Sequence, residues 1–258
     1  MNNSKIILIA LALCPCPILI NAAVIISDTF TTTPGALSGR APETAQTIGD
    51  LWAIDNSDTG NLTVANGTMN LGVNGSYSKA ILPFNDVSVT DTFTLSFDIS
   101  FTPVSAAPVF YAGFGNAAGN GSAFSDNSLG LGFQGSFNNT DTSVTINALS
   151  GETRGWGTIY ASTSLTRATT SDAYVANLKV TYNPVTDQAE FFVNGLSIVS
   201  GTYTDELGGL WFKTDHMDAN APVMVDNLTL TTVPEPSVYA AIAGIATMAM
   251  AIIRRRNK

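Results

Sequence analysis

The sequence predicts an all-β fold, a two-sheet antiparallel sandwich, on three observations. Apolar and polar residues alternate strictly along residues 93–101, where every odd position is apolar and every even position is polar. Such alternation places one face of a strand in a core and the other toward solvent or a ligand. Similar runs rich in Thr, Val, Ile, Phe and Tyr recur through residues 24–232, separated by turn residues. No stretch between them has a convincing helical period.

Two Asn-Gly pairs mark the tightest expected turns of this domain. Asn66-Gly67 and Asn194-Gly195 each stand between two short apolar runs. Because Asn and Gly both accept a positive φ, each pair predicts a two-residue β-hairpin. Counting runs and turns gives roughly twelve strands, which favours a jelly-roll sandwich over a small immunoglobulin domain.

The N-terminal residues 1–23 are typical of a secretory signal peptide. Lys5 supplies the positive charge, residues 6–20 the apolar segment, and Asn21-Ala22-Ala23 a small-residue exit for a signal peptidase. A lipoprotein with Cys14 acylated is the alternative, although the bulky Leu13 stands where a small residue is expected. Export is predicted in either case.

The part expected after export is acidic and free of cysteine. Cys14 and Cys16 both lie in the signal segment, so no disulfide is expected. Residues 28–235 hold all 20 acidic residues but only six of the 11 basic ones, a net charge of −14. Nucleic acid is therefore not an expected partner, since phosphate binding needs clustered Lys and Arg. Cations, neutral glycans and other proteins remain open.

The C-terminal residues predict a transmembrane helix. Residues 238–253 form an uncharged, mostly apolar run, and the basic tail 254–258 follows at once. As a helix this run would span roughly 24 Å at about 1.5 Å per residue, less than a ~30 Å hydrocarbon core. The basic tail should stay cytoplasmic, which places residues 24–232 on the other side of the membrane.

A short motif precedes this helix and completes a three-part pattern over residues 233–258: Pro-Glu-Pro, an apolar helix and an arginine cluster. The motif and cluster residues are Pro234, Glu235, Pro236, Arg254, Arg255 and Arg256. This layout resembles the PEP-CTERM sorting signal of Gram-negative bacteria that make extracellular polysaccharide. The resemblance implies recognition and cleavage at Pro-Glu-Pro by an exosortase, an integral-membrane enzyme, with the arginines as the stop-transfer element. It also implies transient anchoring in the inner membrane before passage to the outer envelope, cell surface or extracellular matrix.

The domain between the two signals resembles a second group of proteins. The resemblance rests on residues 178–182, a turn, residues 189–193 and the Asn194-Gly195 pair, together with residues 28–30 and 37–42. These segments are similar to those of concanavalin A-like and laminin-G-like sandwiches. The resemblance implies a jelly-roll sandwich of a kind that serves many functions, carbohydrate binding among them.

Catalytic residues are hard to find in this sequence. His216 is the single histidine, and no Gly-rich phosphate loop follows a predicted strand. Glycoside hydrolases of similar fold carry paired acids at alternate positions, whereas here no glutamate of the domain has another acid two residues away. We therefore expect a non-catalytic surface or matrix protein associated with exopolysaccharide. A glycan-binding lectin module is the first alternative, and a divergent glycoside hydrolase-like enzyme is the second.

A structural calcium ion, bound by oxygen ligands, is the one cofactor that the sequence favours. Asp28 and Asp226 fall in the first and last predicted strands, and some lectin-like sandwiches join these strands through Ca²⁺. Asp215 and Asp218 form a second oxygen-rich stretch. The alternative is that these acids only form turns and accept hydrogen bonds.

Glycan binding would require exposed aromatic rings that stack on sugars. The candidates are Trp156, Trp52 and Trp211, together with Tyr111, Tyr160 and Tyr203. Trp156 is flanked by Gly155 and Gly157, which would leave its ring open. Packing in the core is the alternative for each of them.

Overall fold

The computed structural model describes twelve segments of the chain. These are residues 23–31, 33–45, 51–54, 62–72, 78–83, 92–102, 106–115, 129–138, 140–150, 158–203, 209–215 and 222–233. The expected signal segment up to residue 22, the Pro-Glu-Pro motif, the expected membrane helix and the basic tail lie outside them, as do Trp156, His216 and Asp218. Within these segments no helix is long and apolar enough to span a bilayer.

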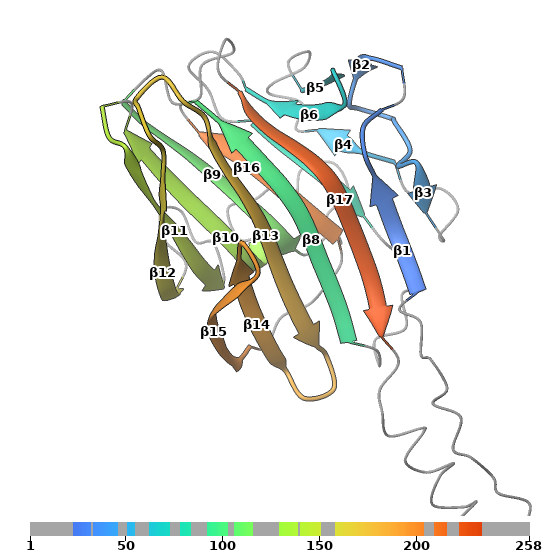
Figure 1. Cartoon of the computed structure of the whole chain (residues 1–258). Coiled ribbons are helices and arrows are strands. Elements are labelled where there is room, and N and C mark those ends of the chain that lie inside the picture. Colours follow the sequence, from blue (N-terminus) through green and yellow to red (C-terminus); the bar gives the residue numbers. More distant parts are fainter. Residues whose placement is uncertain are drawn as a thin grey trace, which may run out of the picture.

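The described residues form two antiparallel sheets packed face to face (Figure 1). The ten-stranded sheet has the order β15 (Leu196–Thr202), β14 (Gln188–Val193), β13 (Tyr174–Asn183), β8 (Thr92–Phe101), β17 (Val223–Val233), β6 (Thr68–Leu71), β5 (Thr63–Ala65) and β2 (Gly35–Ala36). In addition, β1 (Ala23–Asp28) pairs with β17, and β3 (Thr44–Ala45) pairs with β1. The seven-stranded sheet has the order β12 (Thr158–Thr166), β11 (Ser143–Ser150), β10 (Leu129–Asn138), β9 (Ala106–Gly115), β16 (Gly209–Asp215), β7 (Ser78–Pro83) and β4 (Ala53–Ile54). The predicted all-β class with two antiparallel sheets is confirmed.

Both Asn-Gly pairs form the tight turns that the sequence predicts. Asn66 and Gly67 have φ of 55° and 76°, and Asn194 and Gly195 have φ of 52° and 77°. Each pair joins two strands that pair directly beside the turn, with Ala65 and Thr68 as Cα partners between β5 and β6, and Val193 and Leu196 between β14 and β15. Positive φ at both central residues matches the right-handed twist of the flanking strands.

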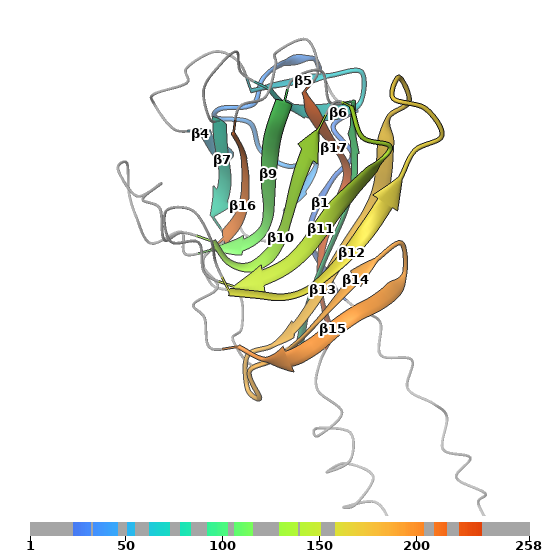
Figure 2. The same ribbon diagram turned by 90° about the vertical axis from the view of Figure 1, so that its left-hand side faces the viewer.

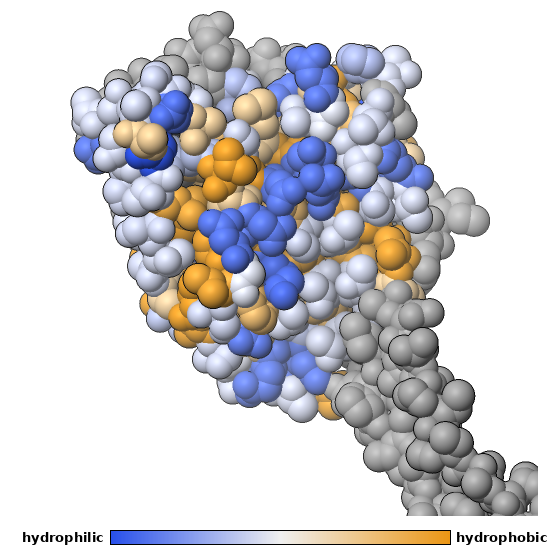
Figure 3. Space-filling view, in the orientation of Figure 1, coloured by the Kyte–Doolittle hydropathy of each residue, from blue (hydrophilic) through white to orange (hydrophobic). Residues whose placement is uncertain are grey.

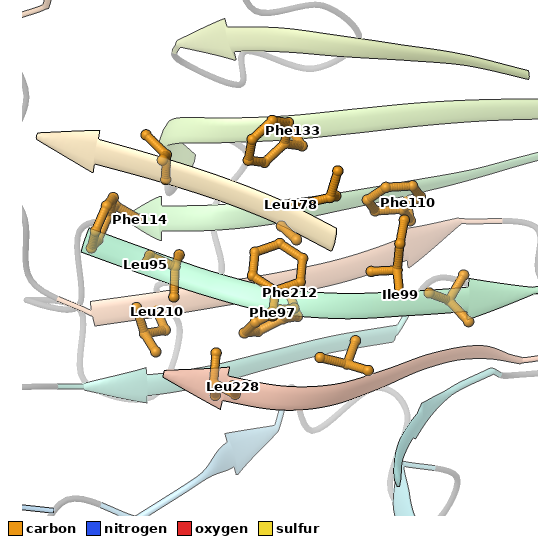
Figure 4. Close-up of a cluster of buried hydrophobic side chains, with 14 of the residues drawn as sticks. Leu95, Phe97, Ile99, Phe110, Phe114, Phe133, Leu178, Leu210, Phe212 and Leu228 are labelled. Atoms are coloured by element: carbon orange, nitrogen blue, oxygen red, sulfur yellow. The ribbon is translucent and has the colours of Figure 1, made fainter. Parts of the chain in front are cut away.

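The main core lies between the two sheets. Along β8 the side chains alternate between buried and half-buried, as the sequence predicts. The Phe97 ring lies 6.4 Å from the Phe133 ring and 5.3 Å from the Phe212 ring, both nearly edge-on. These contacts join β8 of one sheet to β10 and β16 of the other (Figure 4). Close packing of aromatic and aliphatic side chains of this kind is the main stabilising term of a domain without cross-links.

The first and last strands lie side by side at one end of the molecule. Ala23 is the Cα partner of Thr232, and Val24 is that of Thr231. In Figure 1 both ends of the described domain therefore leave the sandwich at the same place. The strand β1 starts at the last residue of the expected signal peptide, and β17 ends directly before Pro234.

Candidate functional site

Trp52 is a core residue. Its side chain is 1% exposed, and its ring lies 6.3 Å from that of Phe30 and 5.9 Å from that of Phe212. The indole Nε1 donates a hydrogen bond to Asp28 Oδ2 at 3.3 Å. Because the ring is enclosed between the sheets, Trp52 is not available to stack on a sugar, and its assignment as a glycan-binding residue is corrected.

The Asp28 carboxylate is fully buried and is held by protein donors. Besides Trp52, it accepts hydrogen bonds from the Phe30 backbone N–H at 3.0 Å and from Arg40 Nη2 at 3.4 Å. Burial is the largest influence on this group and raises the pKa of Asp28, while the three donors lower it. The contacts make Asp28 a structural link between β1 and the segment that follows it.

The acidic residues proposed as calcium ligands do not share one set of contacts. Asp28 and Asp226 are on paired strands, as expected, but Asp226 Oδ1 accepts from the Asn227 backbone N–H and its Cα partner is Asp98. Asp215 ends β16. In the described part of the chain no group of three or more His, Cys, Asp or Glu side chains is placed to hold a metal ion.

The outer face of the ten-stranded sheet carries a polar cluster centred on Asp98. Its two carboxylate oxygens accept from Asn177 Nδ2 and Asn227 Nδ2, each at 2.8 Å. Figure 3 views this face and shows hydrophilic side chains gathered across its middle, over β13, β8 and β17. The amide donors already occupy both oxygens, so the cluster serves to join the three strands.

Trp211 lies on the other side of the molecule, on the outer face of the seven-stranded sheet. Its neighbours Leu210 and Phe212 belong to the core between the sheets, whereas Trp211 clusters with Tyr111 and Leu149. The Trp211 side chain is nonetheless 0% exposed, and its Nε1 has no hydrogen-bond partner within the described segments. A buried donor without a partner is rare and costs about 1–3 kcal/mol. Because the ring is enclosed, Trp211 is not available to stack on a sugar, and its assignment as a glycan-binding residue is corrected in the same way as that of Trp52.

Six polar side chains form a straight row across this outer face. Direct Cα pairings link one strand to the next, from β7 through β16, β9, β10 and β11 to β12. We call the set the outer-face row; its members are Lys79, Lys213, Tyr111, Gln134, Asn147 and Ser162. The lower ends of β9, β10 and β11 bend away from the ten-stranded sheet (Figure 2), so the seven-stranded sheet is curved.

Hydrogen bonds connect four members of the row in one direction. Ser162 Oγ donates to Asn147 Oδ1 at 2.7 Å, Asn147 Nδ2 donates to Gln134 Oε1 at 3.1 Å, and Gln134 Nε2 donates to the Tyr111 hydroxyl at 3.2 Å. Aligned bonds of this kind polarise and strengthen one another. They fix the amide groups in one orientation before any ligand arrives.

The side chains of the row become more exposed to solvent from Gln134 toward Ser162. Gln134 is 1% exposed and Asn147 9%, whereas Ser162 is exposed. At the closed end, the Lys213 ammonium lies 5.1 Å from the centre of the Tyr111 ring and 5.9 Å from that of Trp211. The open end therefore presents the Ser162 hydroxyl to solvent, while the amide groups of Asn147 and Gln134 behind it are buried.

Two glycines lie beside the row and set the spacing of β9 and β10. Gly113 and Gly132 are Cα partners, and they stand between Trp211 and Leu149 in the next line of residues. A Cβ on Gly113 would lie 2.2 Å from the Leu131 carbonyl oxygen, and one on Gly132 would lie 2.3 Å from that of Ala112. Only glycine permits this approach of the two backbones.

Comparisons with known proteins bear on the fold. No protein-family model matches the sequence, and no curated protein matches it. The CBM2 module of the evolved Dit of Lactobacillus casei BL23 phage J-1 is similar in structure, with a TM-score of 0.52, 10% identity and coverage of 83% of this chain and 97% of that chain. The Emp47p carbohydrate recognition domain has a TM-score of 0.51 at 14% identity, with coverage of 81% and 94%. At these identities the similarity shows a shared β-sandwich fold.

Proposed function

We propose that this chain is an exported surface protein whose sandwich, of the concanavalin A-like type, binds polysaccharide without catalysis. The outer-face row carries the proposal. Sugars are bound by planar amides, hydroxyls and aromatic groups arranged on a preformed surface. The row supplies these groups in a fixed orientation and ends at the exposed Ser162. Two proteins of similar fold are named for carbohydrate recognition or as a carbohydrate-binding module, which supports the same proposal.

Binding to the open end of the row tests this function. Asn147→Ala removes an amide that holds both Gln134 and Ser162, so we expect affinity for the polysaccharide to fall about tenfold, the equivalent of roughly 1.4 kcal/mol. Affinity electrophoresis of the full chain in gels containing the host's extracellular polysaccharide measures the change, and a glycan array identifies the sugar.

Asn70→Ala is the matched control for this experiment. Asn70 is half-buried in β6 of the other sheet, where its Oδ1 accepts from Thr68 Oγ1. This variant should keep the affinity of the parent chain. An equal loss of affinity in both variants would mean that the outer-face row is not part of the binding site. A parent chain that binds no polysaccharide would contradict the proposed function.

Sorting through the C-terminal signal is the second part of the proposal. Its support is the motif at Pro234, Glu235 and Pro236 followed by the apolar run and Arg254 to Arg256. The strand β17 ends at Val233, directly before Pro234 in the sequence, which supports a processing site close to the folded domain. Mass spectrometry of the protein in the native host should find most molecules cut near the motif. A predominantly intact tail would instead indicate a permanent anchor.

A further inference from the structure

The two Asn-Gly hairpin turns differ in how firmly the rest of the sheet holds them. Asn194 is bound to the adjacent strand β13 by two hydrogen bonds. Its backbone N–H donates to the Asn177 carbonyl oxygen at 2.8 Å, and its Oδ1 accepts from the Asn177 backbone N–H at 2.9 Å. Asn66 is exposed at the tip of the β5–β6 hairpin, and within the described segments no hydrogen bond of this kind joins it to another strand. The side-chain amide of Asn194 is therefore fixed by the sheet, whereas that of Asn66 is not.

The strands that flank the two turns also differ in length. β5 has three residues and β6 has four, and the outer partner of β5 within the described segments is the two-residue β2. β14 has six residues and β15 has seven, and every residue of β14 pairs with the ten-residue β13. Local opening costs less free energy where fewer backbone hydrogen bonds must break. The turn at Asn66-Gly67 should therefore open more often than the turn at Asn194-Gly195.

Opening of such a turn exposes it to a reaction of its own backbone with the asparagine side chain. Asparagine is a labile residue, and a following glycine has no side chain to hinder the attack. The Gly67 nitrogen bonds to Asn66 Cγ, the Cγ–Nδ2 bond breaks, and the Gly67 amide proton leaves with Nδ2 as ammonia. Water then opens the succinimide ring, on one side to aspartate and on the other to isoaspartate. The attack needs rotation of the Asn66 backbone, which the closed turn opposes, so the reaction proceeds from the opened turn.

We propose that Asn66 is a deamidation site of the folded protein and that Asn194 is protected. The consequence lies in the core beside the turn, where Val64 and Met69 are Cα partners and are 1% and 0% exposed. Isoaspartate adds one backbone carbon to a two-residue turn, so the hairpin no longer closes in its original geometry and these two side chains pack less well. The modified chain is therefore less stable than the new one. None of these steps depends on glycan binding.

Peptide mass spectrometry of the full chain, sampled during incubation at mildly alkaline pH, tests the proposal. In the folded chain we expect conversion at Asn66 to be at least about tenfold faster than at Asn194, the equivalent of roughly 1.4 kcal/mol in the cost of opening the turn. The same chain unfolded in urea is the control, and there both asparagines should convert at similar rates, because glycine follows each of them. Equal rates in the folded chain, or faster conversion at Asn194, would overturn the proposal. So would an unchanged Asn66 in the folded chain after the unfolded chain has converted completely.

The variant Asn66→Asp separates the effect of the new charge from that of the altered backbone. It carries the carboxylate of the aspartate product on a normal main chain, and aspartate also accepts the positive φ of this turn. Freshly prepared, it should unfold at nearly the same urea concentration as the fresh parent chain. The parent chain after incubation should show an additional transition at a lower urea concentration. An incubated chain that contains isoaspartate and unfolds like the fresh one would contradict the loss of packing at Val64 and Met69.

Discussion

Replacement of Asp28 by alanine should lower the free energy of unfolding by about 3–5 kcal/mol, the usual cost of removing one partner of a buried ion pair. The Arg40 guanidinium would lose its carboxylate, and the Trp52 indole N–H would lose its acceptor inside the core. Urea unfolding followed by tryptophan fluorescence measures the change. Asp226→Ala is the matched control: its carboxylate is half-buried and accepts from one backbone N–H, so we expect a loss of about 1 kcal/mol or less.

The pH dependence of stability separates Asp28 from the neighbouring Glu43. Hydrogen bonds from Thr29 and Thr31 lower the pKa of Glu43 to about 2, against 4.5 in a free side chain. The lowered pKa of Glu43 contributes stability above pH 4.5 that is lost as the pH falls toward 2. The raised pKa of Asp28 has the opposite effect, because protonation of this buried carboxylate as the pH falls stabilises the folded state. Glu43→Gln should therefore lose less stability than the parent chain between pH 5 and pH 2.5. Asp28→Ala should lose at least as much, and the reverse order would contradict these assignments.

Phe97→Ala should cost about 3–5 kcal/mol, because it leaves a cavity in contact with both sheets. Phe97 is 0% exposed and its ring contacts those of Phe133 and Phe212 across the sandwich. Because both sheets lose a contact, thermal and urea unfolding should report the same loss. Val175→Ala, on the neighbouring strand β13 and 65% exposed, should change stability by less than about 0.5 kcal/mol. Similar losses in the two variants would mean that Phe97 is not part of the main core.

Periodicity and turn chemistry predict most of this fold from the sequence. The alternation in residues 93–101 appears in β8 as alternating burial, and both Asn-Gly pairs form hairpins. These features are local, since a strand's period and a turn's φ depend on a few adjacent residues. The two-residue strands β2, β3 and β4 are too short to produce a period, which is why the described part holds more strands than expected.

The candidate site could be predicted only in fragments. Trp211 was recognisable as a candidate, but residues 209–213 contain three consecutive large apolar side chains, so their period does not show which face Trp211 occupies. Trp52 is a candidate on the same ground, its residue type alone, and it lies in the core. The outer-face row comes from six strands spread over residues 79–213, and only the register of the sheet brings its members together. No local spacing in the sequence encodes that register.

The position of β17 has a consequence for the order in which the sheet can form. It is the last described strand in the sequence, yet it lies inside the ten-stranded sheet, hydrogen-bonded to β8, β6 and β1. Until residues 223–233 are available to fold, β1 has no partner strand on that side and β8 is an open edge. Contacts between the two ends of a chain form slowly, and unpaired edges invite aggregation in the meantime. If the chain is exported as proposed, translocation of residues 223–233 is the step that closes the sheet, and the chain needs protection from aggregation until that step is complete.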